Sequence, residues 1–362
     1  MVADNRLKGC CFSHVVVEAT FPFLKSRGNE TKFMRKDHVR FLVCPGCKSD
    51  LRLTEIAVTE DTYVETGQLI CEKCKSEYPI IRHIPRFVPL ENYASSFGLE
   101  WGLHAKTQYD SYSGVKISEK RFFEETRWPR NLAGQLILEV GSGSGRFTEQ
   151  AASTNGMVVS MDYSSAVEAN YASNGKRENV LIVQGDVYRM PFREEYFDKL
   201  FCFGVIQHTP DVHKAFQALP HFLKRGGELA VDVYRKLTGI WRLSVTKYWI
   251  RPITRRISPS LLYRITNKYV KFMWPISKLI SRLPYGGTIN WALLVADYRG
   301  LYDLNEDILL EWAILDTFDM LSPAYDSPQS LETVKHWFEE AELTNIDVHY
   351  GYNGIEGRGK KR

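Results

Sequence analysis

The sequence of 362 residues predicts an α/β fold built on a mostly parallel sheet. A short apolar run at 136–140 is typical of a parallel strand that is covered on both faces. A glycine turn follows it at Gly141, Gly143 and Gly145, and a helical pattern begins after the turn. Four further strand-like runs then follow in order, at 157–161, 179–184, 197–203 and 228–233.

The glycine turn predicts a site where a ligand lies against bare backbone, because glycine adopts positive φ and carries no side chain. The spacing GxGxG alone is a weak signal, since it also occurs in loops that bind nothing. The dinucleotide fingerprint GxGxxG is not met, because Arg146 and Phe147 follow where a third glycine would stand.

Polar residues at the ends of the next strands strengthen this prediction. Asp162 ends the second strand, where a carboxylate can bind the two hydroxyls of a ribose. Asp186 ends the third strand, although capping of the following turn would also explain it.

In this order the motifs resemble the nucleotide-binding half of the class I S-adenosylmethionine-dependent methyltransferases, over residues 122–233. The resemblance implies a Rossmann-like sheet of seven mostly parallel strands, with helices on both faces and S-adenosyl-L-methionine as the cofactor. It also implies cofactor contacts from Glu139, Gly141, Ser142, Gly143, Gly145, Asp162, Tyr163, Asp186, Val187 and Phe203.

His208 follows the fourth strand, at the carboxyl edge where ligands bind in open α/β sheets. A histidine there can take a proton from an acceptor hydroxyl as the methyl group leaves sulfur. The alternative is a histidine that only holds a loop, because positioning alone can accelerate an in-line methyl transfer.

The composition is that of an ordinary globular protein, with 44% hydrophobic and 25% charged residues and a formal net charge of +4. No apolar run approaches the ~18 residues of a membrane-spanning helix. No signal peptide is recognised, so we expect a cytoplasmic protein with a disordered leader at 1–36.

Four of the seven cysteines form two CxxC pairs, Cys44 with Cys47 and Cys71 with Cys74. Such pairs place four thiolates around one tetrahedral metal, usually zinc, and leave no open position for catalysis. Two disulfides would be the alternative, but free cysteines elsewhere in a cytosolic enzyme argue against them.

Residues 37–90 around these cysteines resemble the small activator subunit of certain tRNA and protein methyltransferases, here fused in front of the catalytic domain. His83 stands where that family often has glycine. The resemblance implies a structural zinc ribbon.

Residues 91–130 connect this ribbon to the core. The segments 97–101 and 108–110 resemble the part of ribbon-bearing methyltransferases that tends to cover the cofactor. An aromatic strap that only docks the two parts is an equally good interpretation.

Residues 236–325 form a predicted helical insertion after the fifth strand, between the core segments 131–235 and 326–362. No acidic residue lies between Asp232 and Asp297. Twelve Lys or Arg fall in 235–282, at 235, 236, 242, 247, 251, 255, 256, 264, 268, 271, 278 and 282. This bias favours a polyanion: anionic lipid headgroups at a membrane surface, a phosphate-bearing acceptor or an RNA backbone. A solvated helical cap is the plain alternative.

The C-terminal part predicts a helix at 306–315, a return segment at 316–325 and a capped helix at 331–341. Asp319 and Tyr325 of the return segment are candidate acceptor-pocket residues. A terminal hairpin is expected at 345–355, followed by a frayed basic end at 358–362.

These observations predict a methyltransferase that acts on a hydroxyl or amine of a saccharide, a lipid-linked saccharide or a small metabolite. The rival enzyme is an RNA base methyltransferase, although no Asn-Pro-Pro-Tyr signature is present. A non-catalytic scaffold that binds the cofactor is the other alternative. The sequence does not indicate the oligomeric state.

Overall fold

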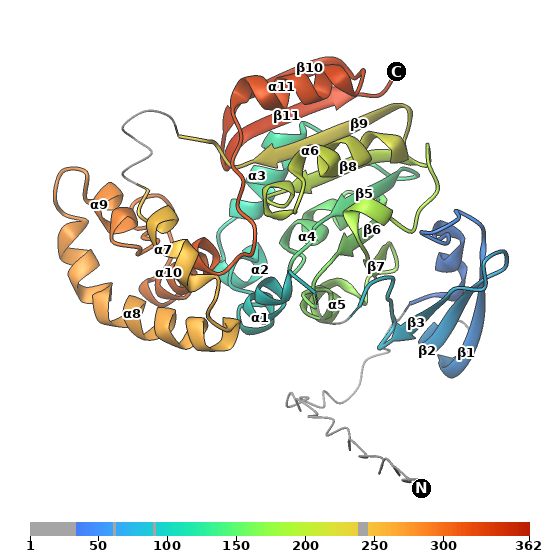
Figure 1. Ribbon diagram of the computed structural model, residues 1–362, viewed down its shortest axis with the longest axis horizontal. Coiled ribbons are helices and arrows are strands. Elements are labelled where there is room, and N and C mark those ends of the chain that lie inside the picture. The colour runs from blue at the N-terminus through green and yellow to red at the C-terminus, as the bar shows by residue number, and fades with distance from the viewer. Residues whose placement is uncertain (1–33, 61–62, 90–91, 238–244) are drawn as a thin grey trace, which may run out of the picture. The chain divides into compact units, whose positions relative to one another are not determined.

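The computed structural model describes residues 34–60, 63–89, 92–237 and 245–362 (Figure 1). Residues 1–33 of the leader expected at 1–36 lie outside the described residues, as do Trp241 and Arg242 of the insertion.

A seven-stranded sheet forms the centre of the fold, in the order β10-β11-β9-β8-β5-β6-β7. The five strands β9, β8, β5, β6 and β7 are parallel to one another, and β11 pairs antiparallel with both β9 and β10. Their bounds are β5 Leu136–Val140, β6 Met157–Asp162, β7 Val180–Gln184, β8 Phe197–Phe203, β9 Leu223–Val233, β10 Thr344–Gly351 and β11 Gly354–Lys360. The predicted fold class is confirmed.

Helices cover both faces of this sheet because alternate strand residues point to opposite sides. Ile137 of β5 packs in a core with residues of α3, α4 and α5, whereas Leu138 packs in a core with residues of α6 and α11. The bounds are α3 Ile117–Thr126, α4 Arg146–Ala152, α5 Val167–Asn174, α6 Val212–Ala218 and α11 Leu331–Glu340.

Three single-turn helices lie between strands of the sheet, and a buried residue of each packs in the core that contains Leu138. They are η2 Val187–Arg189, η3 Ile206–His208 and η4 Pro220–Phe222. The capping of α11 follows the sequence prediction, because the Ser330 side chain accepts a hydrogen bond from the Thr333 N–H at 3.1 Å.

The ribbon is a four-stranded antiparallel sheet with the two cysteine-bearing turns at one end. It contains η1 Lys36–Phe41, β1 Leu51–Glu60, β2 Tyr63–Cys71, β3 Glu77–Ile81 and β4 Ile84–Pro85. The ribbon already includes Met34, which is buried, and Arg35, which bridges to Tyr63. The predicted boundary at residue 37 therefore falls inside it.

The ribbon joins the free edge of the large sheet along β7. The N–H of Phe87 donates to the carbonyl of Gln184 at 2.8 Å, and the N–H of Val43 donates to the carbonyl of Pro191 at 2.8 Å. The Lys48 Nζ donates to the carbonyl of Met190 at 2.8 Å. Buried side chains of both parts form one continuous hydrophobic core.

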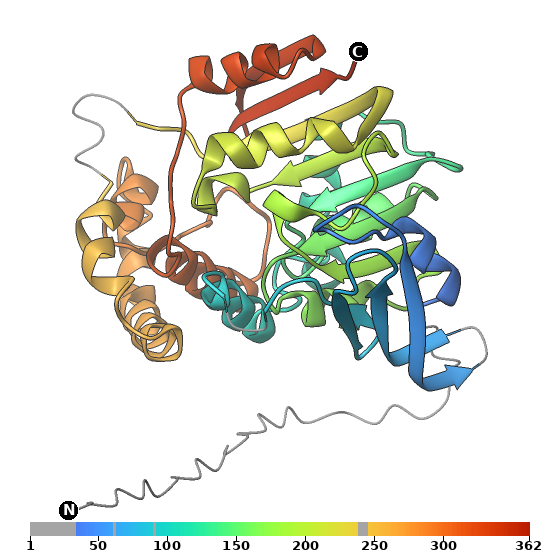
Figure 2. The ribbon, with the colours of Figure 1, turned by 45° about the vertical axis from the view of Figure 1, so that its right-hand side comes forward.

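The strap and the insertion pack together on the carboxyl side of the sheet. The strap contains α1 Ser95–Leu103 and α2 Asp110–Ser113, and the insertion contains α7 Lys247–Thr254, α8 Pro259–Ile280, α9 Gly286–Ala292 and α10 Glu306–Leu321. Figure 2 shows α10 passing beside α1. Among the described helices, none combines the length and the apolar character needed to cross a membrane.

Two C-terminal expectations were wrong. Helix α10 does not stop at 315 but runs to Leu321, because Thr317, Phe318 and Leu321 are buried and continue its apolar face. The basic end is not frayed, since β11 extends to Lys360 and Arg358 is buried. The Arg358 guanidinium donates to the carbonyl of Glu125 at 2.8 Å, which fixes the last strand.

Arg86 and Arg82 form a matched pair for testing the ribbon contact. Both guanidiniums bind Glu168 of α5, but the Arg86 side chain is only 3% exposed and the Arg82 side chain is 63% exposed. Arg86 also donates to Gln184 Oε1 at 2.8 Å. We expect Arg86→Ala to lower the free energy of unfolding by about 2 kcal/mol, because it leaves the buried Gln184 Oε1 unpaired and removes a buried partner of Glu168. Arg82→Ala should cost less than about 1 kcal/mol.

Urea denaturation of the two variants beside the parent protein measures this difference. An equal loss of stability in both variants would contradict the stabilising role of the buried Arg86 contact between ribbon and sheet.

Candidate cofactor pocket and zinc site

A cavity of about 580 Å³ opens where β5, β6 and β8 end. Its wall includes the turns that follow these strands, together with residues of the strap and of the insertion. Nine sequence-predicted site residues line it: Gly141, Ser142, Gly143, Asp162, Tyr163, Val187, Phe203, His208 and Asp319.

Asp162 holds the glycine turn in place. Its Oδ2 accepts a hydrogen bond from the Gly143 N–H at 2.8 Å, and its Oδ1 accepts from the N–H and Oγ of Ser164 at 2.8 and 2.7 Å. Burial raises the pKa of this carboxyl, while these donors act in the opposite direction. The carboxylate therefore lies at the cavity wall in a fixed orientation, where ribose hydroxyls can reach its remaining lone pairs.

The glycine turn is closely covered. Gly143 has φ of +54°, and a Cβ there would lie 3.0 Å from the indole Nε1 of Trp101. A Cβ at Gly141 would lie 2.2 Å from Val205. A side chain is excluded at Gly141 and disfavoured at Gly143 by its positive φ and this tight contact, and the Trp101 ring from α1 covers the turn.

Glu139 does not line the cavity, contrary to the contact that the resemblance implied. Its side chain is buried and accepts hydrogen bonds from the hydroxyls of Thr148 and Ser160. Burial raises its pKa to about 7, although both hydroxyl donors lower it. Glu139 thus links β5 to α4 and β6 beneath the glycine turn. Gly145 also serves packing, because a Cβ there would lie 2.1 Å from Asn170.

Asp186 caps the following turn, as the alternative interpretation expected. Its Oδ1 accepts from the Tyr188 N–H at 2.9 Å, and the side chain does not line the cavity. Its neighbour Val187 does line it, so this turn faces the cavity through Val187.

His208 is buried in the cavity wall, with its ring packed against those of Phe97 and Tyr234. Its Nδ1 lies 3.0 Å from the carbonyl oxygen of Tyr325. A carbonyl only accepts, so Nδ1 is the donor in this contact, and a neutral ring in this orientation has its lone pair on Nε2. This is the tautomer that a general base requires.

The Tyr325 side chain does not belong to the cavity. It is 39% exposed and packs edge-on against Tyr93, so the predicted pocket role of its phenol is not supported. Its contribution is the backbone carbonyl that orients His208.

Three carboxyl groups face the cavity from the strap and from α10: Glu100, Asp316 and Asp319. Glu100 is fully buried and neither of its oxygens has a hydrogen-bond partner among the described residues. Burial, with Asp319 and Asp316 nearby, holds the pKa of Glu100 well above its ordinary value. Burial also raises the pKa of Asp316 to about 7. Asp319 accepts from the Tyr234 hydroxyl at 3.3 Å.

Sequence reasoning missed most of this acidic wall. Glu100 was noticed only as part of the strap, and Asp316 was placed in a return segment rather than in a helix. Helical periodicity was the available signal, since residues 312, 315, 316 and 319 fall on one side of α10 and all line the cavity.

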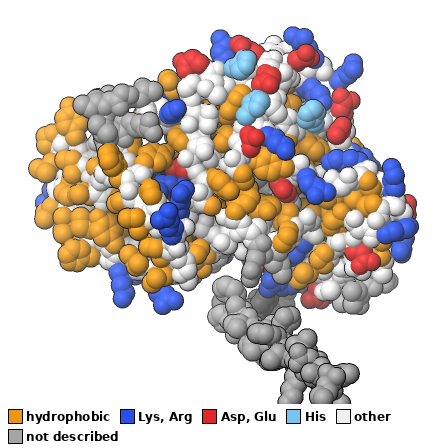
Figure 3. Space-filling view, viewed as in Figure 1, with side chains coloured by type: hydrophobic (Ala, Val, Ile, Leu, Met, Phe, Trp, Pro, Cys, Tyr) orange, Lys and Arg blue, Asp and Glu red, His pale blue; other side chains and the backbone are white. Residues whose placement is uncertain are grey.

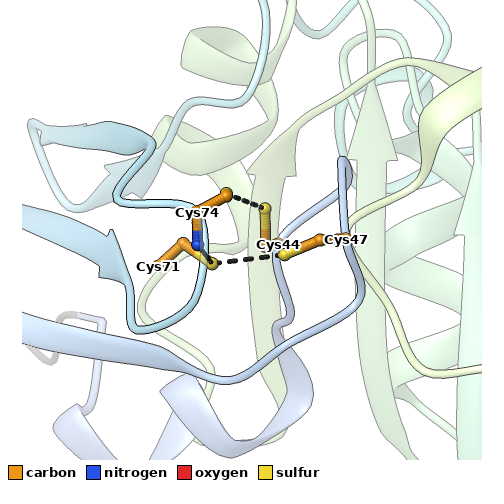
Figure 4. Close-up of side chains that lie close together, drawn as sticks. All are labelled: Cys44, Cys47, Cys71 and Cys74. Carbon is orange, nitrogen blue, oxygen red and sulfur yellow. Dashed lines mark hydrogen bonds between the residues drawn. The ribbon is translucent and has the colours of Figure 1, made fainter.

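The four cysteines of the ribbon come together at the ends of two turns (Figure 4). Their sulfurs lie within 4.8 Å of one another, with Cys44 Sγ 3.6 Å from Cys74 Sγ and Cys47 Sγ 3.4 Å from Cys71 Sγ. A zinc ion with Zn–S bonds of about 2.3 Å places its sulfurs about 3.8 Å apart. None of the five described cysteines forms a disulfide. The residues fit the predicted structural zinc ion.

Comparison with known proteins identifies both parts. Residues 138–231 match the family model of the methyltransferase domain, and residues 35–82 match that of Trm112p-like proteins. Both resemblances drawn from the sequence are therefore confirmed for these segments, and the chain carries the domain of an S-adenosylmethionine-dependent methyltransferase behind a Trm112p-like ribbon.

Individual relatives match over the core. A demethylmenaquinone methyltransferase of Thermobifida fusca is 28% identical over 108 residues, which are 29% of this chain and 46% of that protein. Phosphoethanolamine N-methyltransferase 2 of Caenorhabditis elegans is 33% identical over 150 residues, 36% of this chain and 34% of that protein. The chain thus spans less than half the length of these two curated relatives.

Among solved structures, a SAM-dependent methyltransferase of Aquifex aeolicus aligns with a TM-score of 0.39 and 12% identity, over 75% of this chain and 98% of that chain.

Replacing a zinc ligand tests the four-thiolate site. We expect Cys71→Ser to reduce bound zinc below one ion per chain and to lower stability by roughly 2 kcal/mol or more, because metal binding is coupled to ribbon folding. Cys202→Ser makes the same chemical change at a buried cysteine of β8 and should leave the zinc content unchanged. The zinc content of both purified proteins is measured by metal analysis. One zinc ion per chain in Cys71→Ser would contradict the four-thiolate site.

Adding a side chain to the glycine turn tests the pocket. We expect Gly143→Val to weaken S-adenosylmethionine binding roughly 100-fold, because the new side chain enters the space beneath Trp101. Gly134→Val is the matched control, since Gly134 also has positive φ, +80°, but has no atom within 4 Å of the added Cβ. Isothermal titration with the cofactor should show near-parental affinity for the control. Equal affinity of the two variants would refute the pocket assignment.

Proposed function

We propose that the protein transfers a methyl group from S-adenosyl-L-methionine to a hydroxyl, or an amine, of a saccharide, a lipid-linked saccharide or a related small metabolite. One observation carries the proposal: the glycine turn of the methyltransferase domain and a wall of carboxyl and phenol groups line the same cavity.

The cofactor half of the cavity is formed by the ends of β5 and β6. Asp162 and Val187 would hold the nucleoside part of the cofactor, and the glycine turn would hold the methionine part. The cofactor, when bound, would supply a methyl group on a positively charged sulfur; the nucleophile of the acceptor bonds to the methyl carbon in line with the sulfur, which leaves. The Trp101 ring restricts water over the turn, and this favours productive positioning of the two reactants.

The acceptor half is suited to groups that donate hydrogen bonds. Glu100, Asp316 and Asp319 offer carboxyl oxygens as acceptors, and the two unpartnered oxygens of Glu100 are the most costly to leave unpaired. Hydroxyls of a sugar or an amine of a small metabolite would satisfy them. An ionised phosphate group offers no such hydrogen-bond donors.

Arg146 offers one cation at the same cavity. Its guanidinium lies 4.5 Å from the centroid of the Phe147 ring, and no ion pair with a described acidic residue is found for it. Burial and then Arg121 lower its pKa to about 10. A carboxylate of the acceptor or of the cofactor would pair with this group.

In this proposal His208 would accept the proton of the acceptor hydroxyl. The Tyr325 carbonyl fixes the ring and leaves Nε2 free, as a base requires. Proton removal by a positioned histidine contributes about 10²- to 10⁴-fold to a rate.

The RNA alternative draws on the basic insertion. The acidic wall of the cavity disfavours it. Most cations of α8 lie on its exposed side, whereas Glu100, Asp316 and Asp319 line the acceptor half of the cavity. A cofactor-binding scaffold would explain the glycine turn but not the buried, unpartnered Glu100 facing the same cavity.

Methyl-labelled S-adenosylmethionine and cell extract, divided afterwards into RNA, protein, glycolipid and small-molecule fractions, test the proposal. We expect label in the glycolipid or small-molecule fraction. We expect His208→Gln to reduce the rate roughly 100-fold while cofactor affinity remains, because the amide cannot accept the proton. Label in RNA would establish the alternative, and cofactor binding without any transfer would establish the scaffold.

A further inference from the structure

Helix α8 has two apolar stripes on opposite sides. Its buried stripe faces the insertion core and contains Leu262, Thr266, Val270, Trp274 and Ser277. The opposite stripe is exposed and consists of Leu261, Ile265, Phe272, Ile276 and Leu279, continued by Leu283 just after the helix. Their spacing of three, four or seven residues places them on a single line along the helix. We call this line the α8 stripe.

The exposed apolar surface of the α8 stripe is larger than that of the single apolar residues found on most protein surfaces. Phe272 is 71% exposed and Leu279 is 62% exposed, and the stripe runs the length of a 22-residue helix, about 33 Å. Figure 3 shows hydrophobic side chains gathered over the region of α8, with Lys and Arg at its lower rim. A continuous exposed apolar surface of this kind marks an interaction site.

Cations accompany the stripe along one side. Arg264, Lys268, Lys271 and Arg282 are exposed, and none forms an ion pair within the described part of the chain. Because the sequence contains no acid between Asp232 and Asp297, nothing on α7, α8 or α9 neutralises them.

The adjoining helices extend the same character. Trp249 and Ile253 of α7 are exposed. So are Tyr285, which directly precedes α9, and Ile289 within α9. These helices also reach the cavity, whose wall includes Lys247 of α7 and the α9 residues 288, 291 and 292.

We propose that α7, α8 and α9 form a membrane-docking face that lies in the headgroup region of an anionic lipid surface. The α8 stripe enters the acyl boundary, and the flanking Lys and Arg contact the lipid phosphates. Apolar side chains and basic side chains on one exposed helix side are the signature of an interfacial helix, and each Lys or Arg near an anionic surface adds to the attraction.

Charge argues against a second copy of the chain on this face. A two-fold dimer places the same surface against itself, so cations would meet cations without an acid to separate them. RNA is also disfavoured, because the stripe is mainly aliphatic and single-stranded RNA is held by stacking on aromatic rings.

Docking would place the mouth of the cavity next to the lipid surface, since α7 and α9 belong to both. This step rests on the proposed function, because it explains how a lipid-linked acceptor reaches the cavity. The docking itself does not depend on the reaction, so the two can fail separately.

Flotation of the full-length protein with vesicles tests the docking face. We expect binding to vesicles of phosphatidylcholine with phosphatidylglycerol, weaker binding to phosphatidylcholine alone and partial release by high salt. The double variant Phe272→Ser, Leu279→Ser should bind roughly tenfold less or weaker still, because two side chains no longer enter the acyl boundary. The double variant Lys268→Gln, Lys271→Gln should lose binding to the anionic vesicles by a similar factor.

Matched controls lie elsewhere on the molecule. Tyr350→Ser changes an exposed aromatic residue of β10, and Lys335→Gln changes an exposed lysine of α11; both should bind vesicles as the parent does. Cofactor titration of each variant shows that the pocket is intact. Absence of parental binding to anionic vesicles overturns the proposal. So does a parental dimer, seen by light scattering, that Phe272→Ser, Leu279→Ser converts to monomer without any vesicle binding.

Discussion

The hydrogen bond from the Gly143 N–H to the Asp162 carboxylate is the contact on which the site depends. It joins the turn after β5 to the end of β6, two strands that are neighbours in the sheet. With the turn held in this way, Val205 leaves no room for a side chain at Gly141, and the Trp101 ring packs tightly over Gly143. The pairing of these two strands therefore sets the position of one wall of the cavity. Residues of the strap and of the insertion form the opposite wall.

Much of the fold could be predicted because its signals are local. Strand β8 was predicted with its observed bounds, and its residues 200–203 form the buried apolar run that is typical of a parallel strand. His83 stands where relatives often have glycine, and its φ of +66° shows why glycine suits that turn. What failed depends on distant partners: Glu139 faces hydroxyls of α4 and β6, and Arg358 is fixed by a carbonyl at the end of α3. No pattern in neighbouring residues reports such contacts.

The charges of the insertion divide between two surfaces. Helix α10 turns acids toward the cavity, whereas α8 carries cations on its outer side and has no acid at all. The overall charge of +4 hides this separation. Local fields, rather than the total, determine which ligand each surface attracts. One chain can therefore hold a hydrogen-bond-donating group inside while its outer face is attracted to an anionic surface.

The junction between ribbon and sheet has a consequence for solubility. An open sheet has two edge strands whose free N–H and C=O groups can pair with another chain. In this fold β4 and the following residues occupy the β7 edge through Arg86 and Phe87, and β10 remains as the other edge. The zinc ion, by holding the ribbon folded, also keeps β7 covered. Loss of the zinc ion would therefore unfold the ribbon, expose the β7 edge and make the protein prone to aggregate.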